Sequence, residues 1–256
     1  MTANENRRIG IVVIGDEILA NRRLDKHFQY TVQLLASRGL PLSWAQYLGD
    51  EQDLLARQLR AIRIDGEICF CFGGIGATPD DRTRQAMAQA HDTPLIRHAQ
   101  AVKEIEEQFG KAAYPNRILM AELPQGAELI PNPYNRIPGF SMGNIHCVPG
   151  FPEMAWPMLQ WVLDHHYPHL CNEKIIYSAI IVNDVHESDL LSFMEEFQMK
   201  NPAVKLSSLP RFLPDGGRQI ELGVSGETIA ATEAIAKLEK AISGKGLAYQ
   251  AITPNE

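Results

Sequence analysis

The chain has 256 residues, of which 45% are hydrophobic and 21% charged, a balance typical of a globular protein with one large and one small domain. Its formal net charge of −7, from 24 basic and 31 acidic residues, argues against a protein that binds nucleic acid, which needs a basic surface. The apolar run near the N-terminus is too short for a signal peptide or a membrane span, so we expect a cytoplasmic protein without a membrane partner.

The first 166 residues alternate between strand and helix patterns. A continuous β-branched run over 8–15 is typical of a strand buried on both faces, and apolar residues at helical spacing follow over 24–39. This alternation predicts an α/β domain with a doubly wound, mostly parallel sheet and helices on both faces. The expected elements are strands at 8–15, 42–49, 66–72 and 143–150 and helices at 24–39, 50–64, 80–90, 98–110 and 152–166.

Local signals refine this outline. Asp50 is expected to cap the helix over 50–64, and the proline-rich stretch 123–140 is expected to be mostly loop. Within the helix over 152–166, the tryptophans and methionines are expected in the core or an oligomer interface rather than around a ligand. These residues are Met154, Trp156, Met158 and Trp161.

The second half has a different rhythm. Its expected order is strand 173–182, helix 186–200, strand 203–210, strand 218–225, helix 227–242 and strand 247–252, with a Pro-Asp-Gly-Gly turn at 214–217. This β-α-β-β-α-β order predicts a smaller α+β domain of the ferredoxin-like or KH-like kind, so we place the domains at 1–169 and 170–256. The sequence GVSG (223–226) has the G-x-x-G form of an RNA-binding KH loop but follows a strand, which favours packing or dimerisation over nucleic acid binding.

Acidic residues follow three successive strands of the predicted parallel sheet. Asp16 and Glu17 come after the first strand, Asp50 after the second, and Asp80 and Asp81 close the loop after the third. Because the carboxyl ends of parallel strands meet at one edge of the sheet, we expect these carboxylates to converge there.

The stretch CFGGIGATPDDRTRQA (71–86) combines this acidity with a glycine-rich turn before a helix, an arrangement that usually binds an anion. Aspartates oppose an anion unless a divalent cation lies between them, and Mg²⁺ binds one or two carboxylates together with phosphate oxygens. The alternative is a tight glycine turn in which Asp80 or Asp81 caps the helix. The other two acidic loops favour the metal–diphosphate site.

The sequence GGIGATPDDRT (73–83) resembles the GG-x-G-x-T-x-DD-x-T signature of the molybdopterin-binding domain of molybdenum cofactor biosynthesis proteins. The sequences IGDEIL, LGDE, VPGFPEMAWPM and LPQGAELIPNPYNRIPGF are similar to that domain as it occurs in the CinA (competence/damage-inducible protein A) family. The resemblance spans about residues 8–166. It implies a domain that binds a pterin or a nucleotide diphosphate, commonly as a homo-oligomer (a dimer or trimer). It does not extend to the family's C-terminal nicotinamide-mononucleotide deamidase domain, so we expect a short form without that activity.

The family motifs imply roles for individual residues. The implied substrate-binding residues are Gly73, Gly74, Gly76, Ala77, Thr78, Thr83, Asn135, Pro149, Gly150 and Glu153. Asp50 and Asp81 are the implied catalytic carboxylates, and the implied ligands of Mg²⁺ or another divalent cation are Asp16, Asp50, Asp80 and Asp81. Two departures from the family pattern concern the ligand: Ala77 replaces a frequent proline, and Asn135 with Arg136 replaces a glycine-containing segment.

The resemblance and the carboxylates together lead to a hypothesis of metal-dependent pyrophosphate hydrolysis on a substrate of the ADP-ribose type. One alternative is adenylylation of molybdopterin, and another is a protein that binds a pterin or nucleotide without turnover. The number of carboxylates favours an enzyme, because a plain phosphate-binding protein does not need them.

Three further groups of residues have less specific patterns. The four cysteines, Cys69, Cys71, Cys147 and Cys171, are expected to be small buried residues that form no disulfide framework. His165 and His169 have the spacing of metal ligands, but Pro168 between them favours surface histidines. Arg82 and Arg84 are equally compatible with binding a phosphate and with pairing to Asp80 or facing solvent.

Overall fold

The computed structural model describes residues 8–170, 175–213 and 216–252. The chain forms two compact units, and the boundary between them falls after helix α6 (Pro152–His166) and before strand β9 (Ile175–Asn183). None of the helices within these ranges combines the length and the apolar character that a bilayer-spanning segment needs.

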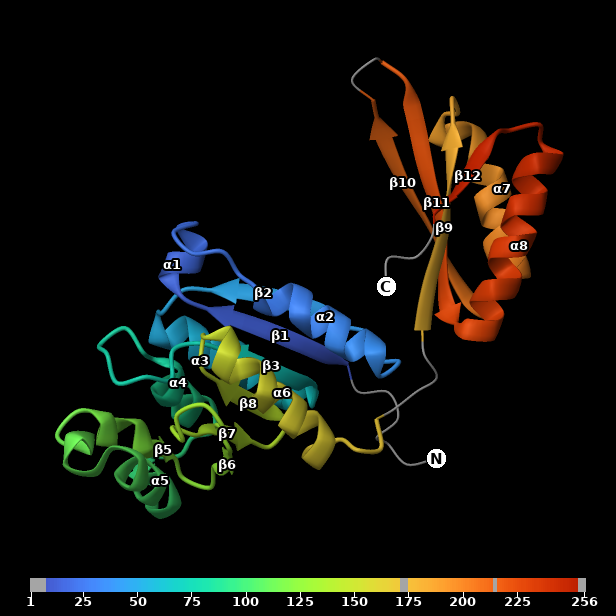
Figure 1. Cartoon of the computed structure of the whole chain (residues 1–256). Coiled ribbons are helices and arrows are strands. Elements are labelled where there is room, and N and C mark those ends of the chain that lie inside the picture. The colour runs from blue at the N-terminus through green and yellow to red at the C-terminus, as the bar shows by residue number, and fades with distance from the viewer. Residues whose placement is uncertain (1–7, 171–174, 214–215, 253–256) are drawn as a thin grey trace. The chain divides into compact units, whose positions relative to one another are not determined.

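The first unit is built on a six-stranded mixed sheet in the order β2-β1-β3-β8-β7-β6 (Figure 1). Its strands are β1 (Ile9–Ile14), β2 (Trp44–Leu48), β3 (Ile68–Phe72), β6 (Glu128–Ile130), β7 (Gly139–Met142) and β8 (Ile145–Val148), and β4 (Leu95–Arg97) pairs separately with β5 (Glu122–Pro124). Strands β2, β1, β3 and β8 pair in parallel, whereas β7 pairs antiparallel to β8 and β6 pairs antiparallel to β7. The predicted α/β fold with a mostly parallel sheet is therefore confirmed.

Helices cover both faces of this sheet (Figure 1). The helices of this unit are α1 (Asp16–Leu19), α2 (His27–Ser37), α3 (Gln52–Asp65), α4 (Thr83–Ala90), α5 (Ala99–Phe109) and α6, with 3-10 turns η1 (Gly110–Ala113) and η2 (Arg117–Ala121). The two-residue period of β3 explains this double coverage. Cys69 and Cys71 pack into the core with α3 and α4, while Phe72, on the other face, stacks on His27 of α2. The three cysteines at 69, 71 and 147 are buried and free, as predicted, and Cys171 lies outside the described residues.

Three helices begin two or three residues later than the sequence prediction. Helix α2 begins at His27 rather than residue 24, because the Asp25 carboxylate accepts hydrogen bonds from the backbone N–H groups of His27 and Phe28. Helix α3 begins at Gln52, and Asp50 does not cap it. Helix α4 begins at Thr83 rather than residue 80.

The stretch 123–140 contains strands that the sequence analysis assigned to loop. Strands β5, β6 and β7 have only three or four residues each. Strands this short contain too few residues for a period-two pattern to be recognised, and the prolines between them favour an assignment to loop.

The second unit is a four-stranded antiparallel sheet in the order β10-β11-β9-β12. Its elements are β9, α7 (Glu187–Lys200), β10 (Val204–Phe212), β11 (Arg218–Glu227), α8 (Thr228–Gly244) and β12 (Tyr249–Ile252). Both helices lie on one face of the sheet and share its core (Figure 1). This arrangement confirms a smaller α+β domain of ferredoxin-like topology. The start of the predicted strand 173–182 and part of the predicted turn at 214–217 lie outside the described residues.

We expected the segment GVSG to follow a strand, but in the structure it forms part of one. Gly223 and Gly226 lie within β11, where they pair with β10 on one side and β9 on the other. A strand paired on both sides has no free G-x-x-G loop to grip a nucleic acid backbone.

A buried hydrogen-bond network crosses the core of the first unit at His146. Its Nδ1 lies 2.8 Å from the Ser141 hydroxyl, and its Nε2 lies 2.7 Å from the Tyr167 hydroxyl. Burial and the nearby His166 lower the pKa of His146 to about 3. The side chain is therefore neutral in the folded protein at neutral pH.

This network makes stability sensitive to mild acid. The unfolded chain takes up a proton at His146 near pH 6.5 and the folded chain does not until about pH 3, so acidification below pH 6.5 favours unfolding. We expect His146 to contribute up to about 1.4 kcal/mol per pH unit to this loss. Urea unfolding between pH 7 and pH 5 measures it, with His146→Gln as the comparison. An equally steep pH dependence in that variant would show that other groups cause the loss.

Candidate functional site

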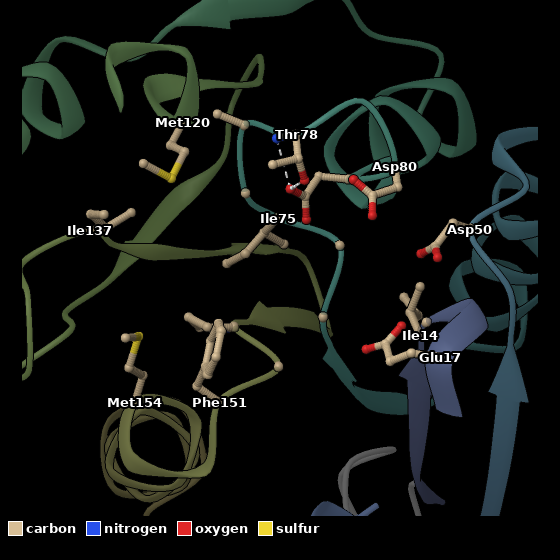
Figure 2. Close-up of a pocket in the computed structure, with 18 of the residues that line it drawn as sticks. Ile14, Glu17, Asp50, Ile75, Thr78, Asp80, Met120, Ile137, Phe151 and Met154 are labelled. Carbon is tan, nitrogen blue, oxygen red and sulfur yellow. Dashed lines mark hydrogen bonds between the residues drawn. The ribbon is translucent and has the colours of Figure 1, made fainter. Parts of the chain in front are cut away.

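A cavity of about 430 Å³ opens at the carboxyl edge of the parallel strands (Figure 2). The segments that follow β1, β2, β3 and β8 all contribute to its lining. Parallel strands end at the same edge, so their following loops meet there whatever their separation in sequence. The cavity is lined by most of the residues that the family motifs implied, namely Asp50, Gly73, Gly74, Gly76, Ala77, Thr78, Asp80, Asp81, Asn135, Pro149 and Gly150.

One end of the cavity is acidic. Asp50, Glu17 and Asp80 all line this end and lie around the same space (Figure 2). Partial burial raises the pKa of Asp50, and the negative charges of Asp16, Glu17 and Asp80 raise it further. A hydrogen bond from the backbone N–H of Asp16 opposes this rise. Negative charge thus accumulates around Asp50, and a bound cation would relieve it.

Asp16 does not line the cavity but forms two hydrogen bonds with Asp50. The backbone N–H of Asp16 donates to Asp50 Oδ2 at 3.0 Å, and the backbone N–H of Asp50 donates to Asp16 Oδ1 at 3.3 Å. This reciprocal pair joins the ends of β1 and β2. Asp16 therefore positions Asp50, and the carboxylate that Asp16 presents to the pair does not line the cavity.

Asp81 is engaged within the glycine loop. Its Oδ2 accepts hydrogen bonds from the Thr78 backbone N–H at 2.9 Å and from the Thr78 hydroxyl (Figure 2). These bonds close the turn over 78–81, so Asp81 holds the loop in shape. Asp80, by contrast, is exposed and faces the acidic end.

The loop glycines are required by contacts within the protein. A Cβ at Gly73 would lie 2.5 Å from the Ile14 carbonyl oxygen, and one at Gly76 would lie 2.4 Å from Asp81 Oδ2. At Gly74, where φ is +69°, a Cβ would lie 2.2 Å from Thr83 Oγ1. Their missing side chains leave room for the loop's own neighbours, and the close approach of a phosphate to their backbone stays a prediction.

Gly74→Ala is therefore expected to destabilise the protein through two effects. The left-handed backbone alone costs about 1–2 kcal/mol for an alanine. The clash with Thr83 adds about 1–3 kcal/mol, because the buried Thr83 hydroxyl donates to the Gly73 carbonyl at 2.9 Å and cannot move freely.

Gly66→Ala is the matched control, since Gly66 has the same φ of +69° and no atom within 4 Å of its hypothetical Cβ. Urea unfolding of the two variants separates the clash from the backbone effect. Equal losses of stability would contradict the contact with Thr83.

The other end of the cavity is apolar (Figure 2). Ile75, Met120, Ile137, Phe151 and Met154 surround it. This is the lining expected for a flat ring, because thioethers and aromatic rings pack against ring faces. Met154 was expected in the core or an interface, and it lines the cavity because α6 begins directly after the strand-end turn at Pro149.

Asparagines border this apolar end. Asn132 is buried, and its amide donates to Asn135 Oδ1 at 2.8 Å and to the Ile137 carbonyl at 2.9 Å. Asn135 directs its own amide toward the Met154 sulfur, 3.6 Å away, which is a weak acceptor. A ligand carbonyl or ring nitrogen would be a better partner for this amide.

Of the two arginines that the sequence left open, Arg82 directly precedes α4 and does not line the cavity, and Arg84 has structural partners. Arg84 is buried and donates to the carbonyl oxygens of Gly76 at 2.7 Å, Leu119 at 2.6 Å and Glu122 at 2.9 Å. It neither faces solvent nor pairs with Asp80. Arg136 pairs with Glu104 and Glu107 of α5 and does not line the cavity, so only Asn135 of the altered segment can affect the ligand.

Two further implied substrate-binding residues lie outside the cavity. Thr83 is fully buried beneath the glycine loop, where its hydroxyl donates to the Gly73 carbonyl. Glu153 lines a neighbouring cavity that contacts the first at Glu17, Arg23 and Gly150. In this structure Thr83 therefore packs against the glycine loop and stabilises it.

Metal ligands are not preassembled in this structure. Across residues 8–170, 175–213 and 216–252, no three histidine, cysteine or carboxylate side chains are grouped closely enough to hold a metal ion by themselves. His165 instead stacks on Trp161 with ring centroids 4.2 Å apart. The carboxylates at the acidic end fit a cation only if it shares its coordination with phosphate oxygens and water, which is the usual binding mode of Mg²⁺.

The fold and the site define an α/β protein with a small-molecule pocket at a parallel-strand edge, acidic at one end and apolar at the other. Residues 10–169 match the family model described as a probable molybdopterin binding domain, and the chain belongs to this family.

Curated relatives are CinA-like proteins. One from Anaeromyxobacter sp. (strain K) is 31% identical over 166 residues, covering 62% of this chain and 41% of the relative. One from Nostoc punctiforme is 29% identical over 248 residues, covering 90% of this chain and 57% of the relative. The chain thus spans about half the length of these relatives. A solved structure of CinA from Thermoplasma acidophilum, of unknown function, aligns with a TM-score of 0.56 at 23% identity, covering 62% of this chain and 98% of that one. That likeness shows a shared fold.

Proposed function

We propose that the protein hydrolyses the pyrophosphate bond of a nucleotide diphosphate of the ADP-ribose type, with Mg²⁺ or another divalent cation. The observation that carries this proposal is the two-ended cavity. Its acidic end suits a cation bridged to phosphates, and its apolar end suits a flat ring.

Each end of the cavity has a defined task in this reaction. Asp50 and Asp80 would hold the cation, which would neutralise charge on the diphosphate and activate water. Asp16 positions Asp50, and Asp81 holds the glycine loop whose backbone lines the diphosphate path. Met120, Met154 and Phe151 would enclose the base, and the Asn135 amide would bind an acceptor on its edge.

Molybdopterin is the second candidate ligand, and the match to a probable molybdopterin binding domain favours it. Molybdopterin also combines a flat ring system with a phosphate group, so it fits the same two ends. The reaction would then be adenylylation of molybdopterin, or the protein would carry the pterin without turnover. Assembly into a homo-oligomer stays a prediction that light scattering measures.

The test is incubation of the purified protein with ADP-ribose, with Mg²⁺ and with EDTA, followed by chromatography for AMP and ribose 5-phosphate. Magnesium-dependent release of both products in equal amounts supports hydrolysis. If no divalent cation supports AMP release and the protein binds molybdopterin, the second candidate function replaces hydrolysis.

A further inference from the structure

Strand β2 lies at an open edge of the first sheet. It pairs with β1 on one side, and within the described residues no strand pairs with it on the other. An open edge presents backbone N–H and C=O groups that another strand can bind, and proteins normally protect such a strand with charged side chains, proline or a covering group. The chemistry of the β2 edge therefore indicates whether it faces solvent or a partner.

Strand β10, at an open edge of the second sheet, has the usual protection. It carries Lys205 and Pro210, and proline has no N–H group to offer to another strand. The Gln198 side chain of α7 covers the start of the same edge. It donates to the Val204 carbonyl at 2.7 Å and accepts from the Leu206 N–H at 2.8 Å. Few backbone groups of β10 are thus left for another chain.

Strand β2 has no such protection. Its sequence, WAQYL, and that of α2, HFQYTVQLLAS, contain no aspartate, glutamate, lysine, arginine or proline, although 21% of the chain is charged. Apolar side chains are exposed on both elements instead. Tyr47 of β2 is 41% exposed, and on α2 Phe28 is 43% and Val32 38% exposed. Uncharged surface next to an open strand edge is typical of an interface between proteins.

The exposed residues of α2 and β2 lie on the same side of the sheet. The Tyr47 hydroxyl donates to the carboxylate of Asp25 directly before α2, at 2.8 Å. Phe28 and Val32 are one helical turn apart and form one flank of α2. Tyr30, on the other flank, stacks on Trp156 of α6 with ring centroids 4.2 Å apart. Phe28 and Val32 therefore point away from α6, which packs on β8, and toward the β2 edge.

The side chains of β2 alternate between the two faces of the sheet. Ala45 and Tyr47 share the α2 face. Trp44 and Leu48 pack against the core that contains α3, and Gln46 lies on their face. Gln46 Oε1 is buried and has no hydrogen-bond partner within the described residues. Because buried amide oxygens are normally satisfied, this atom points to a donor from outside the described chain.

A second copy of β2 matches this edge when it runs antiparallel to the first about a two-fold axis at Gln46. Tyr47 then lies opposite the small Ala45 of the second copy, and Trp44 lies opposite Leu48. Gln46 lies opposite itself, with Cα atoms about 4.5–5.5 Å apart. A glutamine amide has two donors and an acceptor, so two of them satisfy each other reciprocally. None of these pairs brings like charges together.

Other kinds of partner fit this surface less well. Nucleic acids and anionic lipid surfaces attract lysine and arginine, and neither β2 nor α2 has one. A two-fold interface requires a surface that is complementary to itself, which the large-to-small pairing and the glutamine amide provide. The observations therefore favour a second copy of this chain.

We propose that the edge of β2 and the exposed flank of α2 form the two-fold interface of a homodimer, in which the two six-stranded sheets join into one. The family resemblance left a dimer and a trimer open. Antiparallel pairing of two identical edges uses up both of them and closes with two copies. This proposal does not depend on the reaction proposed above.

Sedimentation velocity of the full chain over a concentration series tests the interface, and we expect a dimer. Gln46→Glu and Gln46→Lys each place two like charges directly opposite one another, so the dimer dissociation constant should rise at least about tenfold in either variant. Because residue 46 faces itself, an equimolar mixture of the two variants pairs opposite charges and should regain the dimer. Gln250→Glu, an exposed change on edge strand β12 of the second sheet, is the matched control and should leave the constant unchanged.

Thermal unfolding of each variant confirms that it folds. Val32→Lys, an exposed change on α2, tests the same interface without altering the strand and should also weaken the dimer. A monomer or a trimer of the unaltered protein would overturn the proposal, as would a dimer that neither the Gln46 variants nor Val32→Lys weaken. A mixture of the two Gln46 variants that stays monomeric would show that residue 46 does not face itself and would overturn the two-fold pairing.

Discussion

Replacing Asp50 by asparagine is expected to lower AMP formation from ADP-ribose by about 100-fold or more. Changes around metal sites cost about 10–100-fold even when the altered residue does not touch the metal, and Asp50 is the carboxylate around which the acidic end is built. The asparagine Oδ1 can still accept the hydrogen bond from the Asp16 backbone N–H, so the ends of β1 and β2 stay joined. The measurement is the initial rate of AMP release at saturating Mg²⁺.

Stability should move in the opposite direction from activity. The pKa of Asp50 is raised in the folded protein, so its ionised form opposes folding at pH 7, and a neutral side chain removes that effect. The melting temperature of Asp50→Asn should therefore equal or exceed that of the unaltered protein. Asp65→Asn, at the exposed end of the same helix α3, is the control and should keep full activity. An Asp50→Asn variant with activity within threefold of normal would remove Asp50 from the reaction.

Arg84→Met is expected to cost about 3 kcal/mol or more of unfolding free energy. The buried guanidinium joins three carbonyl oxygens, and each buried carbonyl left without a partner costs about 1–3 kcal/mol. For a unit of this size, 3 kcal/mol corresponds to a fall in melting temperature of about 6–12 °C. Because Arg84 ties the glycine loop to η2, which carries Met120, nucleotide affinity should fall as well.

Arg97→Met is the matched control, because Arg97 contacts Glu122, one of the residues that Arg84 binds, from the surface. Its guanidinium lies 3.0 Å from the Glu122 carboxylate and is about half exposed, and such surface pairs contribute about 0–1 kcal/mol. Calorimetric melting of both variants compares the two. A loss in Arg84→Met no larger than that in Arg97→Met would show that the three carbonyls find other partners.

The sequence was most informative where one periodicity extended over a long segment. The β-branched run of β1 and the alternation in β3 are buried on both faces, and this burial makes their composition distinctive. Residues 122–142 are different, because their strands are short and interrupted by prolines. Pairing of β5 with β4, of β6 with β7 and of β7 with β8 stabilises them rather than local preference.

The candidate site likewise has features that the sequence predicts and features that it does not. The parallel direction of the strands follows from the alternating pattern, and it places Asp50 and Asp80 at the same edge of the sheet without any contact information. The pattern could not reveal which acid faces the ligand. Asp81 and Asp80 are adjacent and chemically identical, and only the hydrogen bonds to Thr78 turn Asp81 into the loop.

By itself, then, the sequence determined the fold class, the edge of the sheet at which the site lies, and its acidic character, because these depend on periodicity and on residues next to strand ends. The tertiary structure alone decided the roles within that site. It buried Arg84 under the loop, tied Asp16 to Asp50, brought Met120 and Met154 to the apolar end, and placed Glu153 in a neighbouring cavity. These roles depend on contacts between residues far apart in the chain, which no local pattern encodes.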